Sequence, residues 1–271
     1  MIASGAQILV GTCGYSYPEW KDAGFYAEDT PSGKMLDTYA RRFSVTELNY
    51  TWYQMPKAPA VERMRRNVPE TFRFAAKLNR KLTHEVEPSQ WRQEAAQYRA
   101  GISPLVQSNQ LAAVLVQFPA SFRRTPENRQ YLAALLDEMG DLPLAVEFRH
   151  VSWATDKVYE AFTEKKVTLV AVDVPDLAWL YPSVDVVTNP DLFYVRFHGR
   201  NAKGWHSGSM QQQFDYDYTA AELSPWADQR IPQMAAQAGT GLVFFNNHVR
   251  AQAPNNALQL IQMLIRQGLF Q

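Results

Sequence analysis

The sequence predicts an α/β fold, a single (β/α)8 barrel of the TIM type with parallel strands. Three observations support it. Eight short apolar runs recur along the chain, segments with helical spacing separate most of them, and the length of 271 residues suits a fold that commonly needs about 250. An open doubly wound sheet is the rival, but no G-x-G-x-x-G turn follows a run. No linker or low-complexity tract interrupts the pattern, so we expect one domain over residues 1–271.

The predicted strands are rich in Val, Ile, Leu and Phe. Near-continuous apolar runs are typical of parallel strands that are covered on both faces. In chain order the runs are Ile8–Cys13, Val45–Asn49, Phe72–Lys77, Leu111–Phe118, Leu144–Arg149, Val167–Asp173, Phe193–His198 and Leu242–Asn246.

Apolar residues at helical spacing predict a helix between most neighbouring runs. In residues 128–140, Leu132, Leu135 and Met139 share one face, and a glycine follows as a stop. Residues 254–268 begin with a proline near the first turn and end at a glycine. The other predicted helices lie within residues 35–43, 58–67, 91–106, 156–166 and 224–239.

Two connections depart from this regularity. Residues 174–191 contain three prolines and no clear helical pattern. Residues 199–223 are long, polar and aromatic, and long irregular loops in compact domains tend to be functional lids or disordered segments. We expect the part from Gly199 to Tyr218, which carries Trp205, to close over a site.

Composition narrows the classes of function and location. The 27 basic and 27 acidic residues give a formal net charge of +0, so no global field draws the protein to nucleic acid or to an anionic membrane. A lone cysteine, Cys13, fits a reducing compartment. The first fifteen residues lack a basic leader, and no stretch approaches the roughly 18 apolar residues of a membrane helix. We expect a cytoplasmic protein without a membrane partner; the oligomeric state stays open.

Polar side chains gather at the C-terminal ends of the predicted strands. Because side chains alternate along a strand, Glu147 and Arg149 share a face, as do Arg196 and His198. In a barrel these ends form one rim, where the active sites of this fold lie. The pattern therefore predicts a convergent polar cluster, with a purely structural charge network as the alternative. The residues are Glu47, Asn49, Lys77, Gln117, Glu147, Arg149, Asp173, Arg196, His198, Asn246, Asn247 and His248.

The same segments resemble a known family. The motifs that carry the resemblance are, in order, GTCGYSYPEW, ELNYTWY, FRFAAKLNRKLTHE, VEFRHVSW, FYVRFHGR, FDYDYTAAEL and VFFNNHVRAQAPNNAL. Together they resemble the YecE-like family of domains of unknown function over nearly the whole chain. The resemblance implies a TIM-type barrel and no established activity. Two positions depart from the expected pattern: Tyr15 replaces a tryptophan, and Cys13 stands where serine is common.

The strand-end residues suggest an acid–base enzyme, hydrolase-like, that acts on a small polar ligand, anionic or phosphorylated. Glu147 and His198 are the acid–base candidates, with Glu47 and Asp173 as supporting carboxylates. Guanidinium and ammonium groups suit an anion, amides donate hydrogen bonds, and aromatic faces stack on sugars or bases. The expected ligand-binding residues are Lys77, Arg149, Arg196, Arg200, Asn49, Asn247, Tyr15, Trp20 and Trp205.

Two alternatives accompany this hypothesis. Carboxylates and histidines at the rim have the right types for a metal, but neither H-x-H nor H-E-x-x-H spacing occurs and the basic residues would repel a cation. We therefore expect no metal and no cofactor. The second alternative is a protein that binds nucleic acid or a phosphorylated metabolite without chemistry. It ranks second because the chain is neutral and has no basic tail.

Overall fold

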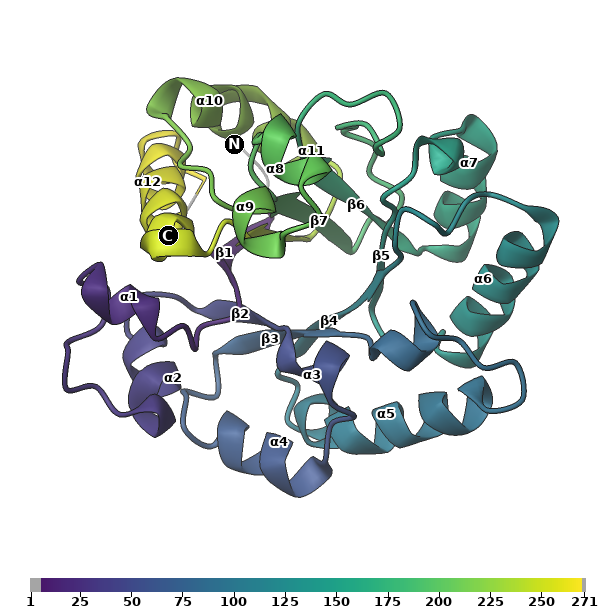
Figure 1. Ribbon diagram of the computed structural model, residues 1–271, viewed down its shortest axis with the longest axis horizontal. Helices are drawn as coiled ribbons and strands as arrows, with labels where there is room; N and C mark the ends of the chain where they lie inside the picture. Colours follow the sequence, from purple (N-terminus) through teal and green to yellow (C-terminus); the bar gives the residue numbers. More distant parts are fainter. Residues whose placement is uncertain (1–5, 270–271) are drawn as a thin grey trace.

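The computed structural model describes residues 6–269, in which eight parallel strands close into a barrel in chain order (Figure 1). Each strand pairs with the next, and β8 pairs with β1 to complete the ring. The predicted (β/α)8 barrel is confirmed, and no strand boundary moves by more than two residues. The strands are β1 (Gln7–Cys13), β2 (Val45–Leu48), β3 (Arg73–Lys77), β4 (Leu111–Gln117), β5 (Leu144–Glu147), β6 (Thr168–Asp173), β7 (Leu192–Phe197) and β8 (Thr240–Phe245).

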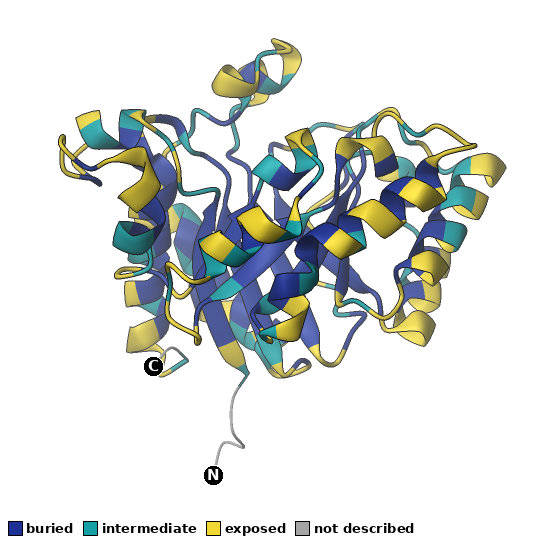
Figure 2. Cartoon of the chain, turned by 90° about the horizontal axis from the view of Figure 1, so that it is seen from below, coloured by how far each residue is buried: buried dark blue, intermediate teal, exposed yellow. Residues whose placement is uncertain are grey.

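Helices surround the barrel and turn their polar faces outward, so that the strands are buried and the outer helix surfaces exposed (Figure 2). Their ends follow local chemistry: the Thr125 hydroxyl accepts a hydrogen bond from the backbone N–H of Asn128 and caps the helix that starts at Pro126. The helices are α1 (Glu19–Asp22), α2 (Met35–Tyr39), α3 (Tyr50–Tyr53), α4 (Ala58–Arg65), α5 (Trp91–Gln107), α6 (Pro126–Glu138), α7 (Asp156–Lys165), α8 (Ala202–His206), α9 (Met210–Gln213), α10 (Ala220–Pro225), α11 (Ile231–Ala235) and α12 (Gln252–Arg266).

The irregular connections differ in how well the sequence predicted them. Residues 174–191 contain no helix, as expected, and one isolated bridge ties Leu180 to His150. The connection after β7 is not simply irregular, because it folds into the short helices α8 and α9. Residues 224–239 were predicted as one helix, but α10 and α11 are separated there by a π-type turn at Trp226–Arg230.

The apolar core fills the barrel and the space between strands and helices. One cluster of buried side chains joins β4, β5 and β6 to α5, α6 and α7, and another joins β1, β7 and β8 to α2 and α12. Fully burying one Val, Leu, Ile or Phe side chain contributes roughly 1.5–3 kcal/mol, so this packing holds the strand ends at the mouth in fixed positions.

Within residues 6–269, no helix has the length and apolar character that crossing a bilayer requires. The expectation that the chain lacks a secretion leader concerns in part residues 1–5, which lie outside the described residues.

A glycine in α5 lets that helix approach the loop before α4. A Cβ at Gly101 would lie 2.2 Å from the backbone oxygen of Pro56. Alanine is the better helix former by about 1 kcal/mol, but the overlap is with backbone and cannot be relieved by a rotamer change. We expect Gly101→Ala to lower the free energy of unfolding by about 2 kcal/mol in urea denaturation. Gly33→Ala is the control, because no atom lies within 4 Å of its new Cβ; equal stability of the two variants would contradict the prediction.

Candidate functional site

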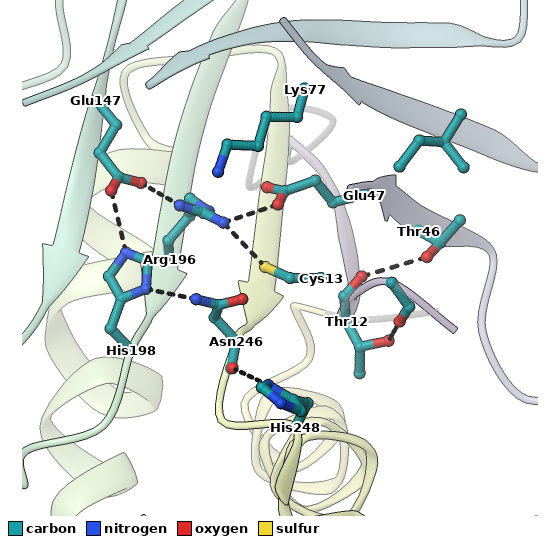
Figure 3. Close-up of polar contacts among 12 residues, drawn as sticks. Thr12, Cys13, Thr46, Glu47, Lys77, Glu147, Arg196, His198, Asn246 and His248 are labelled. Atoms are coloured by element: carbon teal, nitrogen blue, oxygen red, sulfur yellow. Dashed lines mark hydrogen bonds and ion pairs between the residues drawn. The ribbon is translucent and has the colours of Figure 1, made fainter. Parts of the chain in front are cut away.

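A buried charge cluster crosses the barrel at its C-terminal mouth (Figure 3). Arg196 Nη2 donates to Glu47 Oε1 at 2.7 Å, and Arg196 Nη1 donates to Glu147 Oε2 at 2.5 Å. The three side chains come from β7, β2 and β5, which are not neighbours in the sheet, so the contacts pass through the barrel interior. All three are at most 1% exposed. One guanidinium therefore joins two carboxylates from separate strands.

Glu147 is the most heavily contacted of these groups. Its Oε1 accepts from Arg149 Nε at 2.5 Å and lies 3.3 Å from His198 Nε2. On the other side of the imidazole ring, His198 Nδ1 lies 3.1 Å from Asn246 Nδ2, which can only donate. His198 Nε2 also lies 3.5 Å from Arg149 Nη2, so a carboxylate oxygen and a guanidinium nitrogen flank the same ring nitrogen.

The environments of these two groups fix their charge. Burial raises the pKa of Glu147, but the attraction of Arg196 and Arg149 outweighs it and holds that pKa well below its usual range. Burial, reinforced by Arg149, lowers the pKa of His198 to about 3. At neutral pH Glu147 is a carboxylate and His198 is uncharged.

Two further side chains complete the cluster. The Tyr194 hydroxyl donates to Glu47 Oε2 at 2.7 Å, and Cys13 Sγ lies 3.4 Å from Arg196 Nη2. Burial raises the pKa of the Cys13 thiol well above its ordinary value. Tyr194 was not predicted as a site residue, because an aromatic residue in the middle of a strand is typical of the hydrophobic core. Its position two residues before Arg196, on the same face, was the available signal.

Lys77 ends β3 at the same mouth and differs from the other charged groups. Figure 3 shows its side chain pointing toward Arg196. Within residues 6–269, no carboxylate oxygen lies within 4.0 Å of its Nζ, which sits 5.0 Å from the ring centroid of Trp52. Burial and the repulsion of Arg196 lower the pKa of Lys77 to about 8, and the nearby carboxylates only partly oppose this.

A cleft of about 900 Å³ opens above the cluster, within the size range of small-ligand sites. Residues of α8 and α9 form one wall of the cleft. Among them is Trp205, whose ring centroid lies 5.1 Å from the Arg149 guanidinium carbon. The side chains that line the cleft include Tyr17, Asn49, Trp52, Tyr53, Lys77, His84, Gln117, Arg149, Trp179, Arg196, Trp205, Phe214, Asn246 and His248. A second hollow, of about 740 Å³, lies at the opposite end of the barrel and contains none of the charge cluster.

Asp173 and Arg200 do not belong to this mouth. Asp173 pairs in register with Phe197, whose ring packs against Trp226 on the outside of the barrel. The Asp173 carboxylate accepts from Arg200 at 2.8 and 2.6 Å and also from Tyr218 and Trp226. The sequence could not place it, because a strand that is apolar on both faces does not reveal which side its last residue takes.

Three other predicted ligand-binding residues pack the rim rather than line the cleft. Trp20 is buried, and its Nε1 donates to the His248 carbonyl at 2.7 Å. Asn247 Nδ2 donates to the Tyr216 carbonyl at 2.7 Å, which fixes the two loops together. Tyr15 is held through its carbonyl, which accepts a hydrogen bond from a tyrosine hydroxyl at 2.6 Å.

The cleft also contains His84 and Trp179, which were not among the predicted site residues. Trp52 Nε1 lies 3.3 Å from His84 Nδ1, and both line the cleft together with Trp179. His84 and Trp179 lie seven and six residues after the ends of β3 and β6, beyond the strand-end positions on which the prediction was based. In the described part of the chain, no group of three or more His, Cys, Asp or Glu residues is arranged to hold a metal ion.

Because Lys77 has no ion-pair partner among residues 6–269, we expect its buried ammonium to reduce the stability of the fold. At pH 7 we expect Lys77→Met to raise the free energy of unfolding by about 1–3 kcal/mol, because folding no longer moves an ammonium from water into a site that lowers its pKa from 10.5 to about 8. The gain should be full below pH 8 and disappear as pH rises toward 10.5. Urea denaturation between pH 7 and 10 measures it.

The matched control is Lys81→Met. Lys81 Nζ pairs with the buried carboxylate of Glu94 at 2.9 Å, so its removal should lower stability instead. If Lys77→Met is also destabilising at pH 7, Lys77 balances Glu47 and Glu147, and the structural charge network is the better account.

Known proteins resemble this chain along most of its length. The family model described as "Protein of unknown function DUF72" matches residues 9–269. The UPF0759 protein YunF of Bacillus subtilis (strain 168) is 31% identical over 260 residues, which cover 90% of this chain and 92% of that protein. The UPF0759 protein YecE of Escherichia coli (strain K12) is 28% identical over 144 residues, covering 53% of this chain and 48% of that one.

Solved structures agree with the barrel. A DUF72 family protein from Thermotoga maritima MSB8 superposes with a TM-score of 0.87 at 32% identity, covering 96% of this chain and 99% of that one. A DUF72 family protein from Enterococcus faecalis V583 gives a TM-score of 0.85 at 29% identity and covers 96% of each chain. The resemblance to YecE-like proteins in the sequence motifs is thereby confirmed, and the chain belongs to the DUF72 family.

Proposed function

We propose that the protein is a cytoplasmic enzyme that binds a small anionic ligand, a carboxylate or a phosphorylated compound, at the barrel mouth and acts on it by acid–base chemistry. The observation that carries the proposal is an excess of positive charge. Three cations, Lys77, Arg149 and Arg196, face two carboxylates, Glu47 and Glu147, so the formal balance of 3 − 2 leaves one positive charge. A bound anion would complete the balance inside a site where charges interact strongly.

Arg149 is the best placed anion donor. Its Nε is taken by Glu147, and its side chain, 12% exposed, faces the cleft beside Trp205. A guanidinium held in one orientation by a carboxylate can offer its remaining N–H groups to a phosphate or carboxylate as a pair. The fixed orientation reduces the entropy that binding must overcome.

The pKa values of the site residues favour a different acid–base residue from the two expected from the sequence, Glu147 and His198. An ionised Glu147 and a neutral His198 suit the orientation of Arg149 better than the delivery of a proton. Lys77, with its pKa near 8, is the group that exchanges a proton close to neutral pH. Hydrolysis, the reaction favoured from the sequence, is one outcome, since a neutral amine can take a proton from an attacking water.

The alternative function is binding without chemistry, of a phosphorylated metabolite or of single-stranded nucleic acid. The aromatic lining favours it, because Trp52, Trp179 and Trp205 surround a basic floor and Tyr53 is 53% exposed. Aromatic faces beside cations are typical of sites on which bases stack. Such binding would not need an amine that titrates near neutrality.

Intrinsic tryptophan fluorescence can report binding, since three tryptophans line the cleft. We expect inorganic phosphate and pyruvate to give saturable changes, and Arg149→Met to weaken both affinities at least tenfold, about 1.4 kcal/mol. Arg92→Met is the control, because Arg92 is exposed on α5 and is not among the cleft residues. Absence of saturable binding by either anion would contradict the proposed function.

Fluorescence anisotropy with a labelled single-stranded oligonucleotide distinguishes a nucleic-acid-binding protein from the proposed enzyme. Phosphate contacts make nucleic-acid affinity fall steeply between about 50 and about 200 mM salt. Tight, salt-sensitive oligonucleotide binding that phosphate does not displace would favour the binding protein over the enzyme. We expect weak oligonucleotide binding that phosphate or pyruvate displaces.

A further inference from the structure

We infer that Lys77 is the nucleophile of this site and that its amine forms an imine with the carbonyl group of a small ligand that also carries a carboxylate or a phosphate. The inference rests on the proposed function and deepens it by naming the substrate class: anionic aldehydes, ketones or 2-oxo acids. Three features of Lys77 carry it, namely its position, its lack of an ion-pair partner and the charges around it.

The position of Lys77 is fixed by the sheet. Ala75 pairs in register with Glu47, so Lys77, two residues further along β3, lies on the same inner face as that carboxylate. The Thr51 hydroxyl donates to the Lys77 carbonyl at 2.6 Å and anchors the strand end. A reactive group on a rigid strand end is held more precisely than one on a loop.

The lack of a partner separates Lys77 from lysines with structural roles. Lys81 pairs with Glu94 at 2.9 Å and Lys165 pairs with Asp137 at 2.6 Å. No such ion pair reaches Lys77 Nζ from residues 6–269. A partly buried, unpaired ammonium lowers stability. Its placement at the floor of a cleft is explained if the amine has a chemical task.

The groups that face Lys77 come from five elements of the mouth. The cations are Arg196 on β7 and Arg149 after β5; the anions are Glu47 on β2 and Glu147 on β5; His84, after β3, is neutral near pH 7 because burial lowers its pKa to about 4. Both anions are already engaged by arginines. With the pKa of Lys77 near 8, roughly a tenth of the amine is neutral at pH 7, and the neutral amine is the nucleophile.

The step balances without an oxidant or reductant. The nitrogen lone pair of Lys77 attacks the carbonyl carbon, a C–N bond forms, and the carbonyl π electrons move to oxygen, which takes a proton transferred from the nitrogen through cleft water. The resulting hydroxyl takes a second proton from solvent and leaves as water, while the nitrogen lone pair forms the C=N bond. The protonated imine carries the positive charge that the ammonium carried, and the ligand's own anion, bound by Arg149, offsets it.

Reductive trapping tests the inference on the full chain. The protein is incubated with sodium cyanoborohydride and one of three probes: pyruvate, dihydroxyacetone phosphate or acetone. Cyanoborohydride delivers hydride to the imine carbon and leaves a stable secondary amine, which peptide mass spectrometry locates. We expect modification of Lys77 by the two anionic probes at least tenfold above that by acetone, with half-maximal rate near pH 8. Pyruvate and dihydroxyacetone phosphate distinguish a carboxylate from a phosphate ligand.

Variants make each outcome decisive. Lys77→Arg keeps the charge and should abolish the adduct, Lys81→Arg should leave Lys77 modified as in wild type, and Arg149→Met should remove the preference for anionic probes. Modification spread evenly over surface lysines, or none at Lys77 while phosphate still binds through Arg149, would overturn the imine and leave the proposed function standing. Loss of both the adduct and anion binding would overturn both.

Discussion

The charge-assisted bridge from Arg196 to Glu47 and Glu147 is the interaction on which the rest of the mouth depends. Three ionised groups lose their water there, a penalty of several kcal/mol for each ion that only close, well-oriented contacts offset. The planar guanidinium meets that requirement because its two terminal nitrogens reach carboxylates on separate strands. Each carboxylate then orients a second group, Glu47 the Tyr194 hydroxyl and Glu147 the Arg149 guanidinium.

The bridge also explains why Lys77 has no carboxylate partner in the described part of the chain. Glu147 is shared between Arg196 and Arg149, and Glu47 accepts from Arg196 and Tyr194, so the attraction of the two carboxylates for Lys77 only partly offsets its burial and the repulsion of Arg196. The carboxylates of the mouth therefore neutralise the charge of Arg196 but do not pair with that of Lys77. Lys77 lowers the free energy of unfolding in a barrel that is otherwise well packed. Such a cost is expected where a residue is selected for function and not for folding.

Much of this architecture follows from the sequence, and the exceptions have physical causes. The eight strands were readable because apolar runs of that length are covered on both faces. The strand-end pattern also brought together the residues that meet at the mouth, which are Glu47, Lys77, Glu147, Arg149, Arg196 and His198. Asp173 failed the same rule because inner and outer faces are equally apolar in its strand. The neutral state of His198 was not readable, since its low pKa arises from burial and from Arg149, a residue 49 positions away.

The charge cluster has a consequence for how the chain reaches its native state. Glu47 and Arg196 are 149 residues apart, and the ring closes only when β8 pairs with β1. During synthesis the Glu47 carboxylate must remain hydrated until most of the barrel has emerged, because its counter-ion is made late. Contacts of such long sequence separation form slowly. The mouth therefore matures at the end of folding, and a half-barrel fragment could fold its helices without ever acquiring the site.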